Sequence, residues 1–190
     1  EATVDCLNAL GAKITRTDSG YVILPISAPP KAGVLNCCES GSTLRFMLPI
    51  VGALGVDATF LMEGRLPTRP LSPLWEEMER MGCTLTRPTA NTIRCQGKLK
   101  QGKYTIDGGV SSQYITGLLF ALSLIGDSDL QITGKVESRP YIEMTQKAMA
   151  MFGAPHYHSP GVITVEGDWS NGAFWLAAKI LGSELSVMQL

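Results

Sequence analysis

Residues 34–64 read VLNCCESGSTLRFMLPIVGALGVDATFLMEG, and residues 103–134 read KYTIDGGVSSQYITGLLFALSLIGDSDLQITG. Each stretch has a short β-prone run, a turn rich in glycine and serine, a long apolar run and a second β-prone run. A helix that is apolar all round is typical of a position covered on every side. The two stretches therefore predict two copies of a strand–helix–strand motif, each built around a buried helix.

A repeat of 70 residues extends this similarity over most of the chain, since Arg69-Pro70 aligns with Arg139-Pro140 at that shift. Repeats of this kind indicate that one structural unit recurs. Each unit reads as β-α-β-α-β-β, with full units at 31–97 and 98–167 and a partial unit at 1–30. The expected fold class is α/β (α+β), with the units packed around their buried helices.

The elements follow the same order in both full units. In the first we expect a strand at 34–36, a helix at 42–54, a strand at 58–62, a helix at 71–81 and a hairpin of 84–87 with 92–95. In the second we expect a strand at 103–106, a helix at 112–125, a strand at 130–133, a helix at 141–152 and a hairpin around 156–165. The partial unit contributes a helix at 3–10 and a hairpin.

The two ends of the chain fall inside repeat units. A further apolar helix is expected at 170–181, with a strand at 184–190. We therefore expect residues 1–167 to form a first substrate-binding domain and residues 168–190 to be the truncated start of a second. On this interpretation the chain is a fragment of a longer protein.

The helix expected at 71–81 is amphipathic. Its apolar face carries Leu74, Met78 and Met81, whereas Glu76, Glu77 and Arg80 are expected to face water. This pattern is typical of a helix in an outer layer.

Composition excludes several classes of function. The 190 residues carry a net charge of −1, which gives no sign of a nucleic-acid or membrane partner. No apolar run reaches the length of a membrane span. The five Cys have no C-x-x-C pair, and the two His have no clustered ligands, so we expect reduced, mostly buried thiols, no metal and a cytoplasmic location.

Two predicted helix starts combine glycine with hydroxyl side chains. They are Gly41-Ser42-Thr43 and Gly108-Gly109-Val110-Ser111-Ser112-Gln113. Free N–H groups and the positive end of the helix dipole suit an anion at such a start. Taken alone, each is more typical of an ordinary N-cap. Their equivalent positions in two repeats favour anion binding on one side of the molecule.

Arginines follow the second strand of each unit. Arg65 and Arg69 lie in a proline-containing loop, and Arg139 lies in the equivalent loop of the next unit. Guanidinium groups suit carboxylate and phosphate, although a single surface arginine is usually only solvated. The loops supply donors and positive charge, but they offer no obvious general base.

Four motifs carry a resemblance to a known family. They are Gly41-Ser42-Thr43-Leu44-Arg45, Arg65-Leu66-Pro67-Thr68-Arg69-Pro70, Asp107-Gly108-Gly109-Val110-Ser111-Ser112-Gln113 and Ser138-Arg139-Pro140-Tyr141-Ile142. In this order and spacing the chain resembles the 3-phosphoshikimate 1-carboxyvinyltransferases (EPSP synthases). The resemblance implies the inside-out α/β barrel fold of enolpyruvyl transferases. It also implies transfer of the enolpyruvyl group from phosphoenolpyruvate to shikimate 3-phosphate, in the synthesis of chorismate and the aromatic amino acids.

Site residues follow from the resemblance position by position. Shikimate 3-phosphate would be held by Ser111, Ser112, Gln113, Ser138 and Tyr141. Phosphoenolpyruvate would be held by Gly41 and Arg69, with Arg65 in the same loop. No cofactor is implied. The family's catalytic groups, in a Lys-Ser segment near its N-terminus and in its second domain, have no counterpart here. We therefore expect the isolated chain to be inactive without the missing second domain of the same protein.

Some features depart from the family, and two alternatives stay open. The family commonly has Asn-Ala-Gly-Thr where this chain has Glu39-Ser40-Gly41-Ser42. One alternative is a UDP-N-acetylglucosamine enolpyruvyl transferase, which normally carries a reactive cysteine before the Arg-Pro pair. No Cys lies between Cys38 and Cys83, which disfavours it. The other alternative is a non-catalytic binding domain that reuses the fold.

Overall fold

The computed structural model describes residues 1–186, with the side chain of Ser170 excluded. The chain forms two compact units, of which the first spans Glu1–Tyr157 and the second begins at His158. All candidate site residues lie in the first unit. The domain boundary expected at residue 167 stays a prediction.

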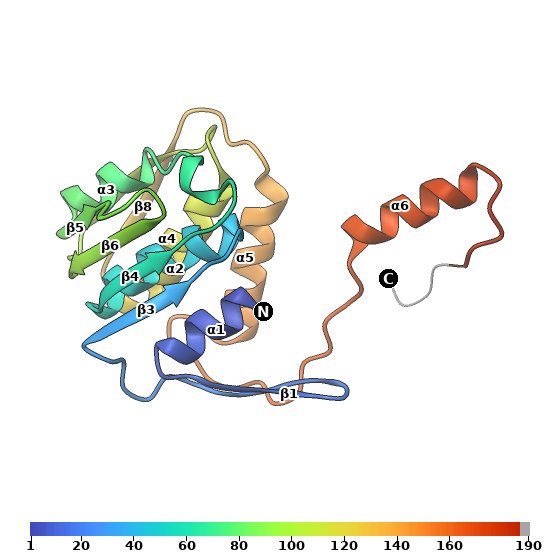
Figure 1. Ribbon diagram of the computed structural model, residues 1–190, viewed down its shortest axis with the longest axis horizontal. Helices are drawn as coiled ribbons and strands as arrows, with labels where there is room; N and C mark the ends of the chain where they lie inside the picture. Colours follow the sequence, from blue (N-terminus) through green and yellow to red (C-terminus); the bar gives the residue numbers. More distant parts are fainter. Residues whose placement is uncertain (187–190) are drawn as a thin grey trace. The chain divides into compact units, whose positions relative to one another are not determined.

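The elements of the first unit form three small sheets around a set of helices (Figure 1). The first segment contains α1 (Ala2–Ala9) and the antiparallel strands β1 (Lys13–Thr17) and β2 (Gly20–Leu24). The second contains β3 (Ala32–Asn36), α2 (Gly41–Leu54), β4 (Asp57–Leu61), the 3-10 helix η1 (Leu66–Thr68), α3 (Leu74–Arg80), β5 (Cys83–Thr86) and β6 (Thr92–Gly97). The third contains β7 (Lys103–Asp107), α4 (Ser112–Ile125), β8 (Asp129–Thr133) and α5 (Arg139–Met151).

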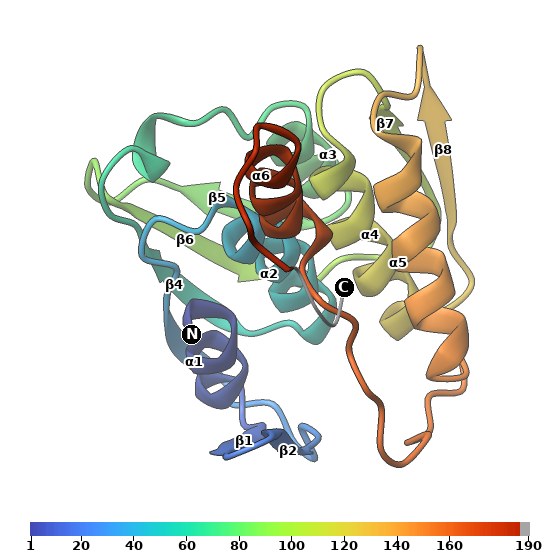
Figure 2. The same cartoon turned by 90° about the vertical axis from the view of Figure 1, so that its right-hand side faces the viewer.

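The β-α-β-α-β-β order expected for residues 31–97 is confirmed. Its four strands form one sheet in the order β3-β4-β6-β5, in which β3 and β4 are parallel and the other pairs are antiparallel. The third segment forms β7, α4, β8 and α5 in the expected order, with β7 and β8 parallel. Figure 2 shows α4 and α5 side by side next to these strands.

The hairpin expected around 156–165 is wrong, because those residues carry no strand. Pro155 and Pro160 interrupt the run and each removes a backbone donor that a sheet ladder needs. Val162 and Val165 are exposed, so no packed face compensates. In the second unit, α6 (Trp169–Ile180) confirms the expected helix. Residues 184–186 form no strand, and the rest of the strand expected at 184–190 lies outside the described residues.

The core is built around α2 and α4, as the apolar runs predict. Leu44, Leu48 and Leu118 are fully or almost fully buried, and Phe46 meets Phe120 edge to face with ring centroids 6.1 Å apart. Both helices are covered less completely than expected. The partly buried Ile50 and Phe120, with residues of α4 and α5 and with Tyr157, line an open apolar groove of about 480 Å³. The five cysteines are free, and all but the half-buried Cys38 are buried.

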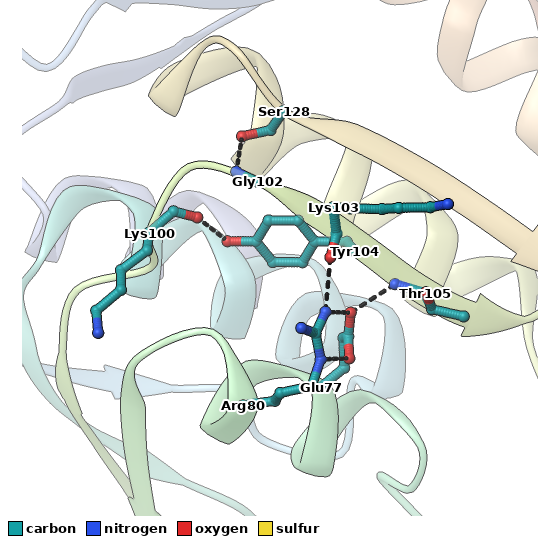
Figure 3. A network of polar contacts seen from close by, with 8 residues as sticks. All are labelled: Glu77, Arg80, Lys100, Gly102, Lys103, Tyr104, Thr105 and Ser128. Carbon is teal, nitrogen blue, oxygen red and sulfur yellow. Dashed lines mark hydrogen bonds and ion pairs between the residues drawn. The ribbon is translucent and has the colours of Figure 1, made fainter.

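Glu77 joins the second segment to the third, which corrects the expectation that it faces water (Figure 3). It is only 7% exposed. Its carboxylate accepts hydrogen bonds from Arg80 Nε at 2.8 Å and Nη2 at 2.7 Å, and from the backbone N–H of Thr105 in β7. Arg80 Nη2 also donates to Lys103 O at 2.7 Å. The amphipathic pattern placed Glu77 on the polar face of α3 with Glu76 and Arg80. Those two are exposed as expected, but β7 covers Glu77.

Tyr104 completes this junction between the repeats. Its ring is fully buried, and its hydroxyl donates to Lys100 O at 2.7 Å. Burial raises the pKa of Tyr104 to about 12, because the phenolate would lose its hydration. The buried phenol therefore stays protonated at neutral pH.

We expect Glu77→Gln to lower the free energy of unfolding at pH 7 by about 1–2 kcal/mol, because the amide loses the charge that holds Arg80. Burial alone would raise the pKa of Glu77, but the hydrogen bonds from Arg80 and Thr105 outweigh it and the pKa is lowered. A carboxyl with a lowered pKa stabilises the fold above its unfolded pKa of about 4.3. That contribution disappears as the pH falls through the folded pKa.

Urea unfolding at pH 7 and at pH 3 measures this effect. Wild type is expected to exceed Glu77→Gln at pH 7 and to approach it at pH 3. The control is Glu79→Gln, since Glu79 lies exposed on the same helix and takes part in no ion pair of the described chain. An equal loss in both variants, or a difference that is constant with pH, would contradict the role given to Glu77.

Candidate functional site

The predicted site residues lie in the loops that follow the strands of the two parallel pairs, and in the first turns of the helices that these loops lead into. The loop after β3 leads into α2 at Gly41, the loop after β4 carries Arg69, and the loops after β7 and β8 lead into α4 and α5. The carboxyl ends of parallel neighbouring strands meet at the same edge of a sheet, where α/β proteins usually bind their ligands. The sheet topology therefore places all eight predicted residues at corresponding ends of their repeats.

Gly41 is the first residue of α2 and is buried. A Cβ at this position would lie 2.8 Å from Nη1 of Arg45 and 2.8 Å from Nη1 of Arg69. Two guanidinium groups therefore converge on one point at the N-terminus of a helix. The ordinary capping role is present as well, since the Ser40 hydroxyl accepts from Thr43 N–H at 3.3 Å.

Arg45 is a site residue to which the sequence analysis assigned no role. Its side chain donates from Nη1 to Gln113 Oε1 at 2.8 Å and from Nη2 to Pro70 O at 3.3 Å. It lies over the ring of Tyr114 at 5.6 Å and is 8% exposed. Its spacing of four residues from Gly41 places both on one helix face, and this was the signal available in the sequence.

Ser111, Ser112 and Gln113 are half-buried at the start of α4. The Ser111 hydroxyl accepts from Gln113 N–H at 3.2 Å, so Ser111 is also the N-cap of the helix. Through its bond to Arg45, Gln113 is brought to the cluster around Gly41. The two helix starts that the repeat pattern singled out are therefore physically connected.

Ser138 and Tyr141 lie at the start of α5 and are exposed. Ser138 has a φ of 55° and its side chain makes no capping bond. Its loop is held near the start of α4, because Glu137 N–H donates to Gly108 O at 3.0 Å. Within residues 1–186, no hydrogen bond joins these two side chains to Ser111, Ser112 or Gln113.

Arg65 is held by its backbone. Its N–H donates to the Glu39 carboxylate at 3.2 Å, and Gly64 lies against the same carboxylate. The Arg65 side chain is exposed and has no recorded partner within the described residues. Glu39 stands where the family commonly has Asn. Its carboxylate thus connects the loop that carries Arg65 to the turn before α2.

The electrostatic balance of this cluster is positive. The ion pairs among the described residues involve Arg80, Arg94 and Lys135, whereas Arg45, Arg65 and Arg69 take part in none. Arg45 is buried, whereas Arg65 and Arg69 are exposed. Guanidinium groups beside a helix N-terminus favour a ligand with phosphate or carboxylate oxygens. In the part of the chain that the structure describes, no group of three His, Cys, Asp or Glu side chains could hold a metal.

None of the helices within residues 1–186 is long and apolar enough to span a membrane.

Known proteins are similar to this sequence over its whole length. The matching family is described as EPSP synthase (3-phosphoshikimate 1-carboxyvinyltransferase), and the match covers residues 1–189. A protein of Clostridium kluyveri named 3-phosphoshikimate 1-carboxyvinyltransferase is 34% identical over 207 aligned residues, covering 100% of this chain and 49% of that protein. One of the same name from Clostridium botulinum Alaska E43 is 35% identical, with the same coverage. The chain spans about half the length of the curated relatives it matches.

Solved structures share the fold. The EPSP synthase of Acinetobacter baumannii superposes with a TM-score of 0.62 at 20% identity, over 87% of this chain and 37% of that one. The enolpyruvyl transferase NikO of Streptomyces tendae gives a TM-score of 0.53 at 13% identity, over 79% and 34%. At these identities the likeness establishes the fold alone, and it confirms the expected α/β class of repeated units.

Proposed function

This chain belongs to the EPSP synthase family, and on that premise we propose that it supplies substrate-binding residues for enolpyruvyl transfer from phosphoenolpyruvate to shikimate 3-phosphate. The observation that carries the proposal is the convergence of Arg45 and Arg69 on Gly41. The Nη1 atom of each arginine lies 2.8 Å from the position that a Cβ on Gly41 would take. A phosphate and a carboxylate on a small molecule are the anions that such a pair of guanidinium groups recognises.

The two substrates are assigned to neighbouring parts of the site. Phosphoenolpyruvate is assigned to Gly41 and Arg69, with Arg65 in the same loop. Shikimate 3-phosphate is assigned to Ser111, Ser112, Gln113, Ser138 and Tyr141, whose hydroxyl and amide groups suit a polyhydroxy acid phosphate. The hydrogen bond between Arg45 and Gln113 supports placing the two sets side by side.

The described part of the site consists of donors and cations. The nearby carboxylates of Glu39 and Asp107 accept hydrogen bonds from the backbone N–H groups of Arg65 and Gly109. General acid–base catalysis needs a group free to take or give a proton. We therefore assign acid–base chemistry to the half of the relatives' length that this chain does not cover, as a second domain of the same protein. A cytoplasmic location and action without a cofactor belong to the same proposal.

We expect the 190-residue chain to bind shikimate 3-phosphate weakly and to release no phosphate from phosphoenolpyruvate. Ser112→Ala is expected to weaken that binding about tenfold, because a hydroxyl that bonds a charged ligand is lost. Calorimetric titration and a phosphate-release assay measure the two properties. Ser123→Ala, at the other end of α4, is the matched control.

Three results would count against the proposal. Turnover by the chain alone would show that its acid–base groups are present. Absence of shikimate 3-phosphate binding would remove the substrate assignment. Tighter binding of UDP-N-acetylglucosamine in the same titration would favour the other enolpyruvyl transferase reaction.

A further inference from the structure

Arg45 is an unusual side chain for the position it occupies. It is 8% exposed, it takes part in no ion pair of the described residues, and its Nε has no hydrogen-bond partner there. Burying a guanidinium group without a carboxylate lowers stability, and an apolar residue of similar volume is often neutral or better. Fold stability alone therefore gives no reason for an arginine at this position.

The contacts of Arg45 determine how Gln113 presents its amide. A guanidinium group only donates hydrogen bonds, so the amide atom 2.8 Å from Arg45 Nη1 is the acceptor, Oε1. The amide nitrogen of Gln113 then faces the opposite way with two N–H donors. Without Arg45, either end of the amide is free to face a ligand.

Arg45 also holds the loop that carries Arg69. Its Nη2 donates to Pro70 O at 3.3 Å, and the Tyr114 hydroxyl donates to the same oxygen at 2.7 Å. Pro70 directly follows Arg69, whose Nη1 lies 2.8 Å from the position of a Cβ on Gly41. One side chain therefore contacts elements of both proposed substrate sites.

We infer that Arg45 is a positioning residue, which sets the amide of Gln113 in the donor orientation that the phosphate and hydroxyl oxygens of shikimate 3-phosphate require. This inference rests on the proposed function for its ligand. Its geometric part, the control of the Gln113 amide by Arg45, holds for the free protein.

The first measurement needs no ligand. In ¹⁵N relaxation of glutamine side chains, the Nε2 group of Gln113 is expected to be rigid in the wild-type chain and as mobile in Arg45→Met as the exposed Gln146, which has no recorded hydrogen bond in the described chain. Unchanged rigidity of Gln113 in Arg45→Met would overturn the inference, whether or not a substrate binds.

The second measurement separates positioning from stability. Arg45→Met is expected to weaken shikimate 3-phosphate binding at least tenfold while the urea midpoint stays level or rises. Gln113→Glu keeps an acceptor for Arg45 but loses both donors, so it is expected to unfold no more easily and yet to bind at least tenfold more weakly. Arg45→Lys, which keeps the charge and one donor, is expected to recover part of the loss.

The control is Thr116→Val, at a residue of α4 like Gln113, which removes the buried hydrogen bond of 2.8 Å between Thr116 and Thr145 of α5. It is expected to lower the urea midpoint and leave binding unchanged. Binding losses that follow stability across all variants would make Arg45 a structural residue and sink the inference. A wild-type chain that binds no shikimate 3-phosphate would count against the proposed function, while the relaxation measurement would still decide the role of Arg45.

Discussion

Replacing Arg69 by alanine is expected to weaken phosphoenolpyruvate binding by about a hundredfold, the largest effect on binding of any single change in the site. The Nη1 atoms of Arg69 and Arg45 each lie 2.8 Å from the position that a Cβ on Gly41 would take. An anion bound at the start of α2 would therefore contact both guanidinium groups. Charge-assisted hydrogen bonds are about twice as strong as neutral ones, and a hundredfold loss corresponds to about 2.8 kcal/mol of binding free energy. Chemical-shift titration of the 190-residue chain detects even the weak binding expected here.

Two arginine variants serve as controls for Arg69→Ala. Arg16→Ala makes the same change in net charge at an exposed residue of β1, whose side chain makes no hydrogen bond or ion pair within the described residues. It is expected to leave binding unchanged. Arg65→Ala is expected to have a smaller effect than Arg69→Ala, because no contact places the Arg65 side chain at Gly41. Equal losses for Arg69→Ala and Arg16→Ala would reduce the effect to general electrostatics and contradict the site.

Gly117→Ala is expected to lower the free energy of unfolding by about 2–3 kcal/mol, the largest effect on stability. Gly117 in α4 faces α2, and a Cβ there would overlap the Arg45 carbonyl oxygen and lie 3.2 Å from Pro49 Cγ. Pro49 has no N–H to bond that oxygen within α2, so the backbones of the two helices meet closely at this point. A clash with backbone cannot be relieved by a side-chain rotation.

Thermal unfolding measures the effect, as a fall in midpoint of roughly 4–12 °C for a chain of this size. The helix propensity of alanine works against the fall by about 1 kcal/mol, so a fall would demonstrate the overlap clearly. Gly33→Ala is the matched control, because its Cβ would make only ordinary contacts, at 3.7 Å to Ala9 O and Leu35 Cδ1. Gly117→Ala with wild-type stability would show that α2 and α4 do not meet closely.

Much of the architecture was predictable because its causes are local. Capping glycines and serines, apolar runs of helical length and β-prone segments specify the element order of 31–97 without knowledge of the rest of the chain. The hairpin around 156–165 failed for the complementary reason. The equivalent hairpin of the first unit is β5 with β6, and β6 also pairs with β4, whereas β8 pairs with β7 alone among the described strands. A strand needs a neighbour as well as a pattern.

The sequence alone determined the repeat, the fold class and the loops that carry the site, since periodicity and turn chemistry are properties of neighbouring residues. Only the tertiary structure decided which charged side chains are buried and which groups they bond. Glu77 has the spacing of a solvated helix residue, yet β7 covers it and supplies the N–H of Thr105. Arg45 ends a motif visible in the sequence, but its role depends on Gln113, which is 68 residues away along the chain. Such partners are set by which elements pack against one another. Burial then makes the charge of Glu77 a connection between two repeats, and that of Arg45 a connection between two parts of the site.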